Sequence, residues 1–315
     1  MPVCGNSIST PSRAIFGYEL VSLLGQGAGS IIYAVCRPGS NQLLAMKHVV
    51  CKAERDHRYY EQLHNEYEVG RQVCHSALRR SLELKLETSW MYKVREAALV
   101  MELVDGIPLD QQHGVTIADT MATFGCVAGA LRALHALGYV HCDLKPNNIL
   151  RSADGRTRVI DLGQACVVNS VKKRIQGTVD YIAPEQVKLQ PITPRTDVFN
   201  YGATLYWALT RKHLPTFLNI AKNPNSFLLD SAMAPPHLIN DQVPEALSLL
   251  VMDCVHTDPN RRPDLVDVQR RLDAIAFASA RHTAQPKTGP NRCGESAYGI
   301  STAGADRRCQ LACFE

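Results

Sequence analysis

Residues 141–148 read HCDLKPNN, and this stretch decides how the rest of the chain is interpreted. It follows a segment of helical periodicity and precedes a short strand candidate, so we expect a loop that presents polar groups on a rigid scaffold. Asp143 can accept a hydroxyl proton, Lys145 can neutralise a transferring phosphoryl group, and Asn148 offers an amide oxygen to a metal ion. The alternative is a polar surface loop that caps the preceding helix, but the clustering of three such groups favours chemistry.

Downstream, residues 159–163 read VIDLG and place Asp161 at the end of a hydrophobic strand candidate. Gly163 allows a sharp turn directly after it. By itself an aspartate in this setting more often belongs to a turn. A carboxylate here also suits a hard cation that bridges phosphates, and its place after Asp143 in the chain favours that reading.

Upstream, residues 44–47 read LAMK, so Lys47 stands alone on an otherwise apolar strand candidate. A lysine in such a place needs a counter-charge or a substrate anion, and a nucleotide phosphate would serve. Glu66, on the helix candidate that follows, is the expected partner. Glu61 and Glu68 are competing candidates that are better explained as solvated surface charges.

A glycine-rich stretch, GQGAGSIIY at residues 25–33, lies between two strand candidates. Glycines let the backbone approach a phosphate and offer its N–H groups to the anion. Taken alone the stretch is a weak signal, because an ordinary glycine-rich hairpin is about as good an explanation. The residues that would contact a nucleotide here are Gly25, Gln26, Gly27, Ala28, Gly29 and Ser30.

The composition excludes several classes of protein. The chain has 315 residues, 45% of them hydrophobic and 20% charged, which suits one large globular domain or two lobes. A net charge of +4 without a dominant basic run does not indicate nucleic-acid binding. Apolar stretches such as residues 97–104 and 202–209 are far shorter than the roughly 20 residues that cross a bilayer, and residues 1–17 contain no signal-like apolar run.

Eleven cysteines are an odd number, and most lie singly in core-like segments, which favours a reducing cytoplasm over a disulfide framework. Cys293, Cys309 and Cys313 lie in a polar tail without close cysteine pairs or nearby histidines. Structural zinc is therefore not expected there.

Hydrophobic periodicity divides the chain into two parts. Alternation predicts three antiparallel strands between residues 18 and 50, then a helix over residues 52–73 and strands over 82–86 and 97–103. After residue 104 the pattern becomes mainly helical. The elements expected in this second part are helices over residues 117–137, 198–209, 244–254 and 265–278 and short strands over 149–150 and 158–160.

Together these residues resemble the eukaryotic-type, or Hanks-type, serine/threonine protein kinases over about residues 17–279. The resemblance implies an α+β, bilobal protein-kinase fold that binds ATP between a small antiparallel-sheet N-lobe with one helix (17–104) and a mainly helical C-lobe (105–279). Residues 1–16 would form an N-terminal extension and residues 280–315 a disordered tail.

The resemblance also assigns roles to residues of the site. Asp143 would be the catalytic base with Lys145 beside it, Asn148 and Asp161 would bind Mg²⁺, with Mn²⁺ as a substitute, and Lys47 would pair with Glu66. Residues 102–104 would be the hinge, with Met101 as gatekeeper. Besides the glycine-rich stretch, the residues implied to surround ATP are Ile32, Ala45, Lys47, Glu66, Met101, Glu102, Val104 and Leu150.

Three later segments continue the resemblance in order: GTVDYIAPE at residues 177–185, Asp197, and DPNRRP at residues 258–263. By resemblance Glu185 pairs with Arg262 and Asp197 braces the catalytic loop. Lys145 together with Thr178 resembles serine/threonine rather than tyrosine kinases. Protein substrates would bind along the segment around Thr178.

The chain departs from the family pattern at several positions. Ser30 replaces the third loop glycine and Gly29 an aromatic residue, which predicts a looser nucleotide lid without loss of function. Cys142 replaces an arginine that pairs with a phosphorylated activation loop, so phosphate-switched activation is not expected. Leu162 replaces a phenylalanine. Lys172, Lys173 and Arg174 are either a solvated face or a site for an acidic partner or substrate.

Two other functions compete with the kinase interpretation. A pseudokinase would bind partners without phosphoryl transfer, and the complete set of polar site residues argues against it. A small-molecule kinase would share the catalytic loop, but generally lacks the Ala-Pro-Glu segment at residues 183–185. The resemblance suggests a cytoplasmic signalling enzyme, with bacteria as a candidate source and no membrane or nucleic-acid partner. The oligomeric state, the target protein and the upstream signal are not encoded in any motif.

Overall fold

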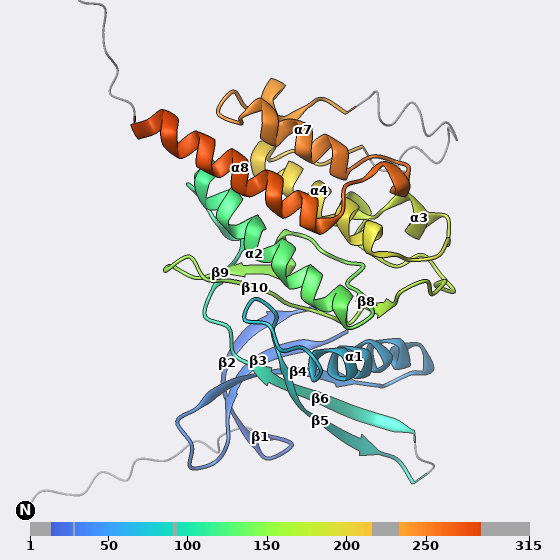
Figure 1. Ribbon diagram of the computed structural model, residues 1–315. Helices are drawn as coiled ribbons and strands as arrows, with labels where there is room; N and C mark the ends of the chain where they lie inside the picture. The colour runs from blue at the N-terminus through green and yellow to red at the C-terminus, as the bar shows by residue number, and fades with distance from the viewer. Residues whose placement is uncertain (1–13, 28, 91–92, 216–232, 285–315) are drawn as a thin grey trace, which may run out of the picture.

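The computed structural model describes residues 14–27, 29–90, 93–215 and 233–284, with side chains described up to residue 281. These residues form two lobes, a first with a sheet and one long helix and a second that is mainly helical (Figure 1). The predicted α+β, two-lobed architecture is therefore confirmed.

The first lobe is built on a six-stranded antiparallel sheet in the order β1-β2-β3-β4-β6-β5. The strands are β1 (Ala14–Ile15), β2 (Tyr18–Gln26), β3 (Ile31–Cys36), β4 (Leu43–Val50), β5 (Ser81–Thr88) and β6 (Val94–Glu102).

Alternation along β4 explains how this sheet buries both of its faces. Leu44 and Met46 belong to one buried cluster, whereas Ala45 and Val49 belong to another on the opposite face, with Leu63 of the helix. Side chains on a strand alternate between faces, so Lys47 shares the face of Ala45 and Val49. The charged side chain of β4 thus points to the side of the sheet that carries the helix.

That helix is α1 (His57–Gly70), preceded by a 3₁₀ turn at Glu54–Asp56. It is shorter than the predicted 52–73 because the Asp56 carboxylate accepts hydrogen bonds from the N–H groups of Lys52 and Ala53, which holds that segment in a turn. The buried residues of α1 include Leu63 and Glu66, one turn apart on the face toward the sheet.

The helical lobe contains α2 (Ile117–Ala136), α3 (Pro184–Val187), α4 (Pro194–Thr210), α7 (Glu245–Cys254) and α8 (Leu265–Ala284). A reciprocal cap starts α2, in which the Thr116 hydroxyl accepts from the Asp119 N–H and the Asp119 carboxylate accepts from the Thr116 N–H. Gly202 lets α4 approach α7 closely, because a methyl group there would lie 2.6 Å from the Cys254 Cβ.

Of the helices in the described ranges, α2 alone is long and apolar enough to suit a bilayer by length and composition. Half of that apolar window is buried inside the protein, and Phe124, Val127 and Leu131 are fully buried in the cluster that forms the core of the lobe. The hydrophobicity of α2 is accounted for by this packing.

Short strands and 3₁₀ turns connect the longer elements of the second lobe. A three-stranded sheet has the order β10-β9-β7, and β11 pairs with β8. These strands are β7 (Ile107–Pro108), β8 (Tyr139–Val140), β9 (Ile149–Arg151), β10 (Thr157–Val159) and β11 (Cys166–Val167). The 3₁₀ turns are Leu109–Gln111, Pro146–Asn148, Val179–Tyr181, Pro236–Leu238 and Pro259–Arg261.

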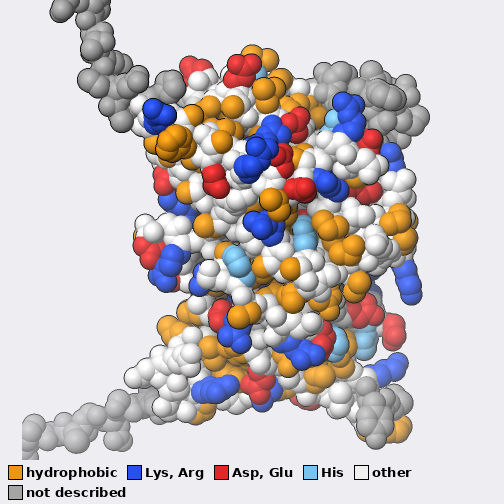
Figure 2. Space-filling model, viewed as in Figure 1, with side chains coloured by type: hydrophobic (Ala, Val, Ile, Leu, Met, Phe, Trp, Pro, Cys, Tyr) orange, Lys and Arg blue, Asp and Glu red, His pale blue; other side chains and the backbone are white. Residues whose placement is uncertain are grey.

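The structure differs from the expected boundaries at both ends. β1 lies within the segment expected as an N-terminal extension and pairs with β2. At the other end α8 continues to Ala284, so the first residues of the expected tail are helical. The remainder of that tail, with Cys293, Cys309 and Cys313, lies outside the described residues. Figure 2 shows basic and acidic side chains interspersed over the viewed face of both lobes.

Candidate active site

Lys47 of β4 and Glu66 of α1 form an ion pair where the helix packs on the sheet. The Lys47 Nζ lies 2.7 Å from the Glu66 Oε2, and the side chain of Glu66 is only 3% exposed. Of the two competing glutamates, Glu68 instead accepts a hydrogen bond from Arg71, and Glu61 is exposed. The pairing expected from the sequence is therefore present.

Arg79 occupies the second oxygen of Glu66, a contact that the sequence did not indicate. Its Nη2 donates to the Glu66 Oε1 at 3.0 Å, and Arg79 itself is buried. The Arg79 N–H donates to the carbonyl of Val159, the last residue of β10. Glu66 is thus held between two cations, which fixes the rotation of its carboxylate.

Asp161 joins the same charged group from the end of β10. Its Oδ1 accepts from the Lys47 Nζ at 3.2 Å, and its φ of 64° turns the chain sharply at this point. Asn65 of α1 then donates to three carbonyls of the following segment, those of residues 162, 163 and 165, at 2.8–3.3 Å. Helix α1 therefore positions both Glu66 and the segment that follows Asp161.

The electrostatic interactions within this group keep Lys47 and Asp161 ionised at neutral pH. Burial by itself would lower the pKa of Lys47, but the carboxylates of Glu66 and Asp161 outweigh it, and the pKa lies well above its ordinary value. Partial burial by itself would raise the pKa of Asp161, but the charges of Lys47 and Arg79 hold it well below its usual range. The ammonium and the carboxylate are therefore both ionised.

The catalytic-loop residues predicted from HCDLKPNN converge on Asp143. The Lys145 Nζ donates to the Asp143 Oδ2 at 3.0 Å and to the Thr178 Oγ1 at 2.9 Å. The Thr178 hydroxyl in turn donates to the Asp143 Oδ1 at 2.8 Å. The segment that contains Thr178 is thus fastened directly to the candidate base.

Asn148 and Asp161 are the oxygen donors available for a metal ion. The amide nitrogen of Asn148 donates to the Asp143 carbonyl at 2.9 Å, which leaves its amide oxygen for another partner. One Asp161 oxygen remains beside the one that contacts Lys47, and its side chain is 36% exposed. One carboxylate and one amide suit Mg²⁺, which is usually held by few protein groups together with water and phosphates. The described residues contain no group of three or more metal-binding side chains.

Asp197 of α4 holds the backbone of the catalytic loop in place through hydrogen bonds. Its two oxygens accept hydrogen bonds from the N–H groups of His141 and Cys142, at 2.8 and 2.9 Å. The His135 Nε2 lies 2.7 Å from the same carboxylate. Burial would raise the pKa of Asp197, but these hydrogen bonds outweigh it and lower the pKa.

A second buried ion pair fastens the end of the segment between Asp161 and Glu185, which we call the activation segment. Arg262 contacts the Glu185 carboxylate with both terminal nitrogens, at 2.7 and 2.9 Å. The neighbouring Gln186 donates to the carbonyls of Cys142 and Gln176. Gln186 thus links the activation segment to the catalytic loop, a role that no sequence pattern revealed.

The glycine-rich loop connects β2 to β3, and the Gly27 N–H closes it on the Ser30 carbonyl at 2.8 Å. Ala28 lies outside the described residues. A methyl group on Gly29 would lie 2.3 Å from the ring of Tyr59, so this aromatic residue of α1 packs directly against the loop. The Tyr59 ring thus occupies the space that a side chain at position 29 would need.

The residues expected around the adenine group come from β3, β4, β6 and β9 and from the segment that follows β6. Ala45 pairs with Met101 across β4 and β6, and Ile32 pairs with Lys47 across β3 and β4. Met101 is fully buried, whereas Ile32, Glu102, Val104 and Leu150 are half-buried. Leu150 of β9 lies close to Gly106, just beyond the expected hinge. Their contact with a nucleotide stays a prediction.

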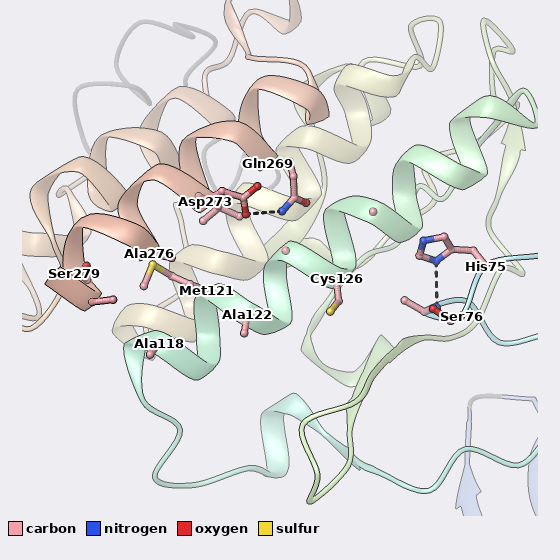
Figure 3. A pocket seen from close by; sticks show the side chains of 15 residues that line it. His75, Ser76, Ala118, Met121, Ala122, Cys126, Gln269, Asp273, Ala276 and Ser279 are labelled. Carbon is pink, nitrogen blue, oxygen red and sulfur yellow. Dashed lines mark hydrogen bonds between the residues drawn. The ribbon is translucent and has the colours of Figure 1, made fainter. Parts of the chain in front are cut away.

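A groove of about 740 Å³ lies between α2 and α8 (Figure 3). Small side chains such as Ala118, Ala122 and Ala276 line it, and Gln269 and Asp273 are hydrogen-bonded to each other at its rim. The groove contains none of the predicted site residues, so it plays no part in the chemistry of the charged groups.

Comparison with known proteins agrees with the geometry. Residues 18–271 match the family model of the protein kinase domain. The chain is 29% identical over 294 residues to the human serine/threonine-protein kinase Nek10, covering 86% of this chain and 24% of that protein. It is 30% identical over 263 residues to the probable serine/threonine-protein kinase PkwA of Thermomonospora curvata (81% and 34%). Its identity to the serine/threonine-protein kinase AfsK of Streptomyces coelicolor is 28% over 275 residues (85% and 33%). The chain thus spans about a quarter to a third of the length of these relatives.

Proposed function

The chain belongs to the protein kinase family, and from this premise we propose that it transfers the γ-phosphoryl group of ATP to serine or threonine hydroxyls of protein substrates. The observation that carries the proposal is the convergence of two charged groups at the junction of the lobes. One group joins Lys47, Glu66 and Asp161, and the other joins Asp143, Lys145 and Thr178.

In this proposal Asp143 acts as the general base. Its carboxylate accepts the proton of the attacking hydroxyl, while the hydrogen bonds from Lys145 and Thr178 keep it oriented. Lys145 also carries the positive charge that offsets negative charge on the transferring phosphoryl group. Both side chains are partly accessible, at 11% and 23% exposure.

Lys47 binds and orients the phosphates of ATP, and Glu66 with Arg79 holds the carboxylate against which Lys47 is positioned. Asn148 and Asp161 would hold Mg²⁺, or Mn²⁺ in its place. When bound, such an ion neutralises phosphate charge and orients the γ-phosphoryl group for in-line attack. The backbone N–H groups of the loop at Gly25–Gly27 would contact the same phosphates.

Two features support a protein substrate carrying serine or threonine. The Ala-Pro-Glu segment at residues 183–185 is anchored through the Glu185–Arg262 pair, which gives the activation segment a fixed platform. Thr178 sits beside Asp143, where a substrate hydroxyl must arrive. The relatives named above are serine/threonine-protein kinases by name.

The pseudokinase alternative would require one of the charged groups to be incomplete or displaced. The present Lys47–Glu66 contact at 2.7 Å supports the active interpretation, because α1 lies where this pair can form. We place the reaction in the cytoplasm, and the unbonded state of seven described cysteines supports that location.

The test uses the purified 315-residue chain with γ-labelled ATP, Mg²⁺ and a generic protein substrate, followed by phosphoamino-acid analysis. We expect phosphoserine or phosphothreonine, lost in Lys47→Met. Arg80→Met, which changes an exposed cation outside the site, is the matched control and should retain transfer. Binding of ATP without transfer would favour the pseudokinase. Transfer to a small hydroxylated compound but to no protein would favour the small-molecule kinase.

A further inference from the structure

Two cysteine sulfurs meet between the catalytic loop and the activation segment. The Sγ atoms of Cys142 and Cys166 lie 3.4 Å apart, within hydrogen-bond distance but without a covalent bond. Cys166 begins β11 and pairs with Val140 of β8, so the two chain segments are already held together by a strand ladder. A disulfide requires an S–S distance of about 2.05 Å, which side-chain rotation at a contact pair can reach.

The backbone around Cys142 fixes one partner firmly. Cys142 has φ of 67°, its N–H donates to Asp197 and its carbonyl accepts from Gln186. Cys142 is fully buried. Cys142 also directly precedes Asp143. A covalent bond between its sulfur and Cys166 would therefore link the candidate base to the activation segment.

Cys166, in contrast, is open to solvent molecules. It is half-buried and lines a cavity of about 540 Å³ together with Ser170 and the basic residues Arg58, Lys172, Lys173 and Arg174. Small reagents can therefore reach Cys166 more readily than the fully buried Cys142. The basic triplet singled out in the sequence forms part of this wall.

We propose that Cys166 and Cys142 form a thiol oxidation site, at which hydrogen peroxide closes a disulfide between the activation segment and the catalytic loop. The Cys166 sulfur attacks one peroxide oxygen, an S–O bond forms, the O–O bond breaks and the first water leaves. The Cys142 sulfur then attacks the sulfenic sulfur, the S–S bond forms, the S–O bond breaks and the second water leaves with the Cys142 proton. Two thiols are oxidised and one peroxide is reduced.

The charges around Cys166 agree with its role as the attacking group. The hydrogen bond with Cys142 lowers the pKa of Cys166 to about 6, with help from Ser170 and Lys172 and against burial and the charge of Asp197. The same contact, together with burial, raises the pKa of Cys142. The other charged groups that face Cys166 across the cavity are Arg58, Glu61, Lys173 and Arg174. Because the thiolate is the nucleophile, reaction with peroxide should rise with pH and be half-maximal near pH 6.

The experiment treats the reduced 315-residue protein with hydrogen peroxide and unfolds it in denaturant, so that an alkylating agent reaches every remaining thiol, including the buried Cys142. The peptides are then mapped by mass spectrometry. We expect one linked pair of peptides that contain Cys142 and Cys166, lighter by two hydrogen atoms and separated again by dithiothreitol. The inference concerns the two thiols alone and does not rest on the proposed activity.

Variants make the order of events visible. Cys166→Ser should abolish the linked pair and leave Cys142 alkylated. Cys142→Ala should leave a sulfenic acid on Cys166 that dimedone traps. Cys51→Ser is the matched control, because Cys51 is also half-buried but its sulfur contacts a backbone carbonyl at 3.9 Å. In this variant the Cys142–Cys166 link should form as in the wild-type chain.

The inference fails if Cys142 is still alkylated in the treated wild-type chain after Cys166 has been consumed. It also fails if Cys166 links to a different cysteine, or if the rate of Cys166 oxidation keeps rising up to pH 9 as for an ordinary thiol. Because Cys166→Ser changes a half-buried position, its folding can be checked by comparing its thermal unfolding with that of Cys51→Ser.

Discussion

Glu66 binds a lysine with one carboxylate oxygen and an arginine with the other. The two cations come from different segments of the chain. Lys47 reaches Glu66 from β4 and Arg79 from the loop before β5. A buried carboxylate that loses one of two charged partners keeps a desolvated oxygen without compensation. Arg79 is therefore a positioning residue for Glu66, and through Glu66 for Lys47.

Replacing Arg79 tests this at the scale of one side chain. We expect Arg79→Met to lower the free energy of unfolding by about 2 kcal/mol, because a hydrogen bond to a buried charge is lost. The neighbouring Arg80 is exposed, so Arg80→Met should change it by no more than about 0.5 kcal/mol. Chemical denaturation of the two variants makes the comparison. Equal stability of both would show that the Arg79 contact has no structural weight.

The Lys47–Glu66 pair could be predicted because a lone lysine on an apolar strand demands a counter-charge, and one helix follows that strand. Arg79 could not, because it shares its residue type with Arg80 and its segment has no periodicity that separates a buried from an exposed position. Gln186 was missed for a similar reason. Its amide bridges two segments that only the folded chain brings together.

Helix α1 positions most of the site. Its residues Glu66, Asn65 and Tyr59 contact β4, the segment after Asp161 and the glycine-rich loop, respectively. The position of Tyr59 also explains why residue 29 is glycine. A side chain there would clash with the tyrosine ring, so the loop can pack against the helix only if residue 29 has no side chain.

A double-mutant cycle tests this contact between elements. Gly29→Ala should lower the free energy of unfolding by about 1 kcal/mol or more, because its methyl group would lie 2.3 Å from the Tyr59 ring. In a Tyr59→Ala background the same change should cost almost nothing. Gly25→Ala is the matched control, since a methyl group there meets nothing within 4 Å. Additive effects of the Gly29 and Tyr59 changes would refute the contact.

The long elements were predictable because their hydrophobic periodicity is sustained, as in α2 and α8. The start of α1 was placed too early because a carboxylate that folds back on the preceding backbone leaves no periodic signal. Two-residue strands such as β7, β8 and β11 are too short to show alternation, and their pairing depends on the packing of the whole lobe.

At the scale of the whole molecule, buried charges fasten distant segments around the junction of the lobes. Asp197 of α4 fixes the catalytic loop, and Arg262 fixes the end of the activation segment through Glu185. These contacts were expected only from the resemblance to protein kinases, because no local sequence pattern relates residues so far apart. The unforeseen link is the sulfur contact between Cys142 and Cys166, which joins the same two segments.

The central claim is that Asp143 acts as the base in phosphoryl transfer from ATP, and the most direct measurement compares the wild-type chain with Asp143→Asn. The amide keeps the shape of the side chain but accepts no proton, so the rate of transfer to a protein substrate should fall by a factor of about 10² to 10⁴. ATP binding, measured in parallel by calorimetry, should be nearly unchanged because Lys47 and Asp161 remain. Transfer at the wild-type rate by Asp143→Asn would contradict the account.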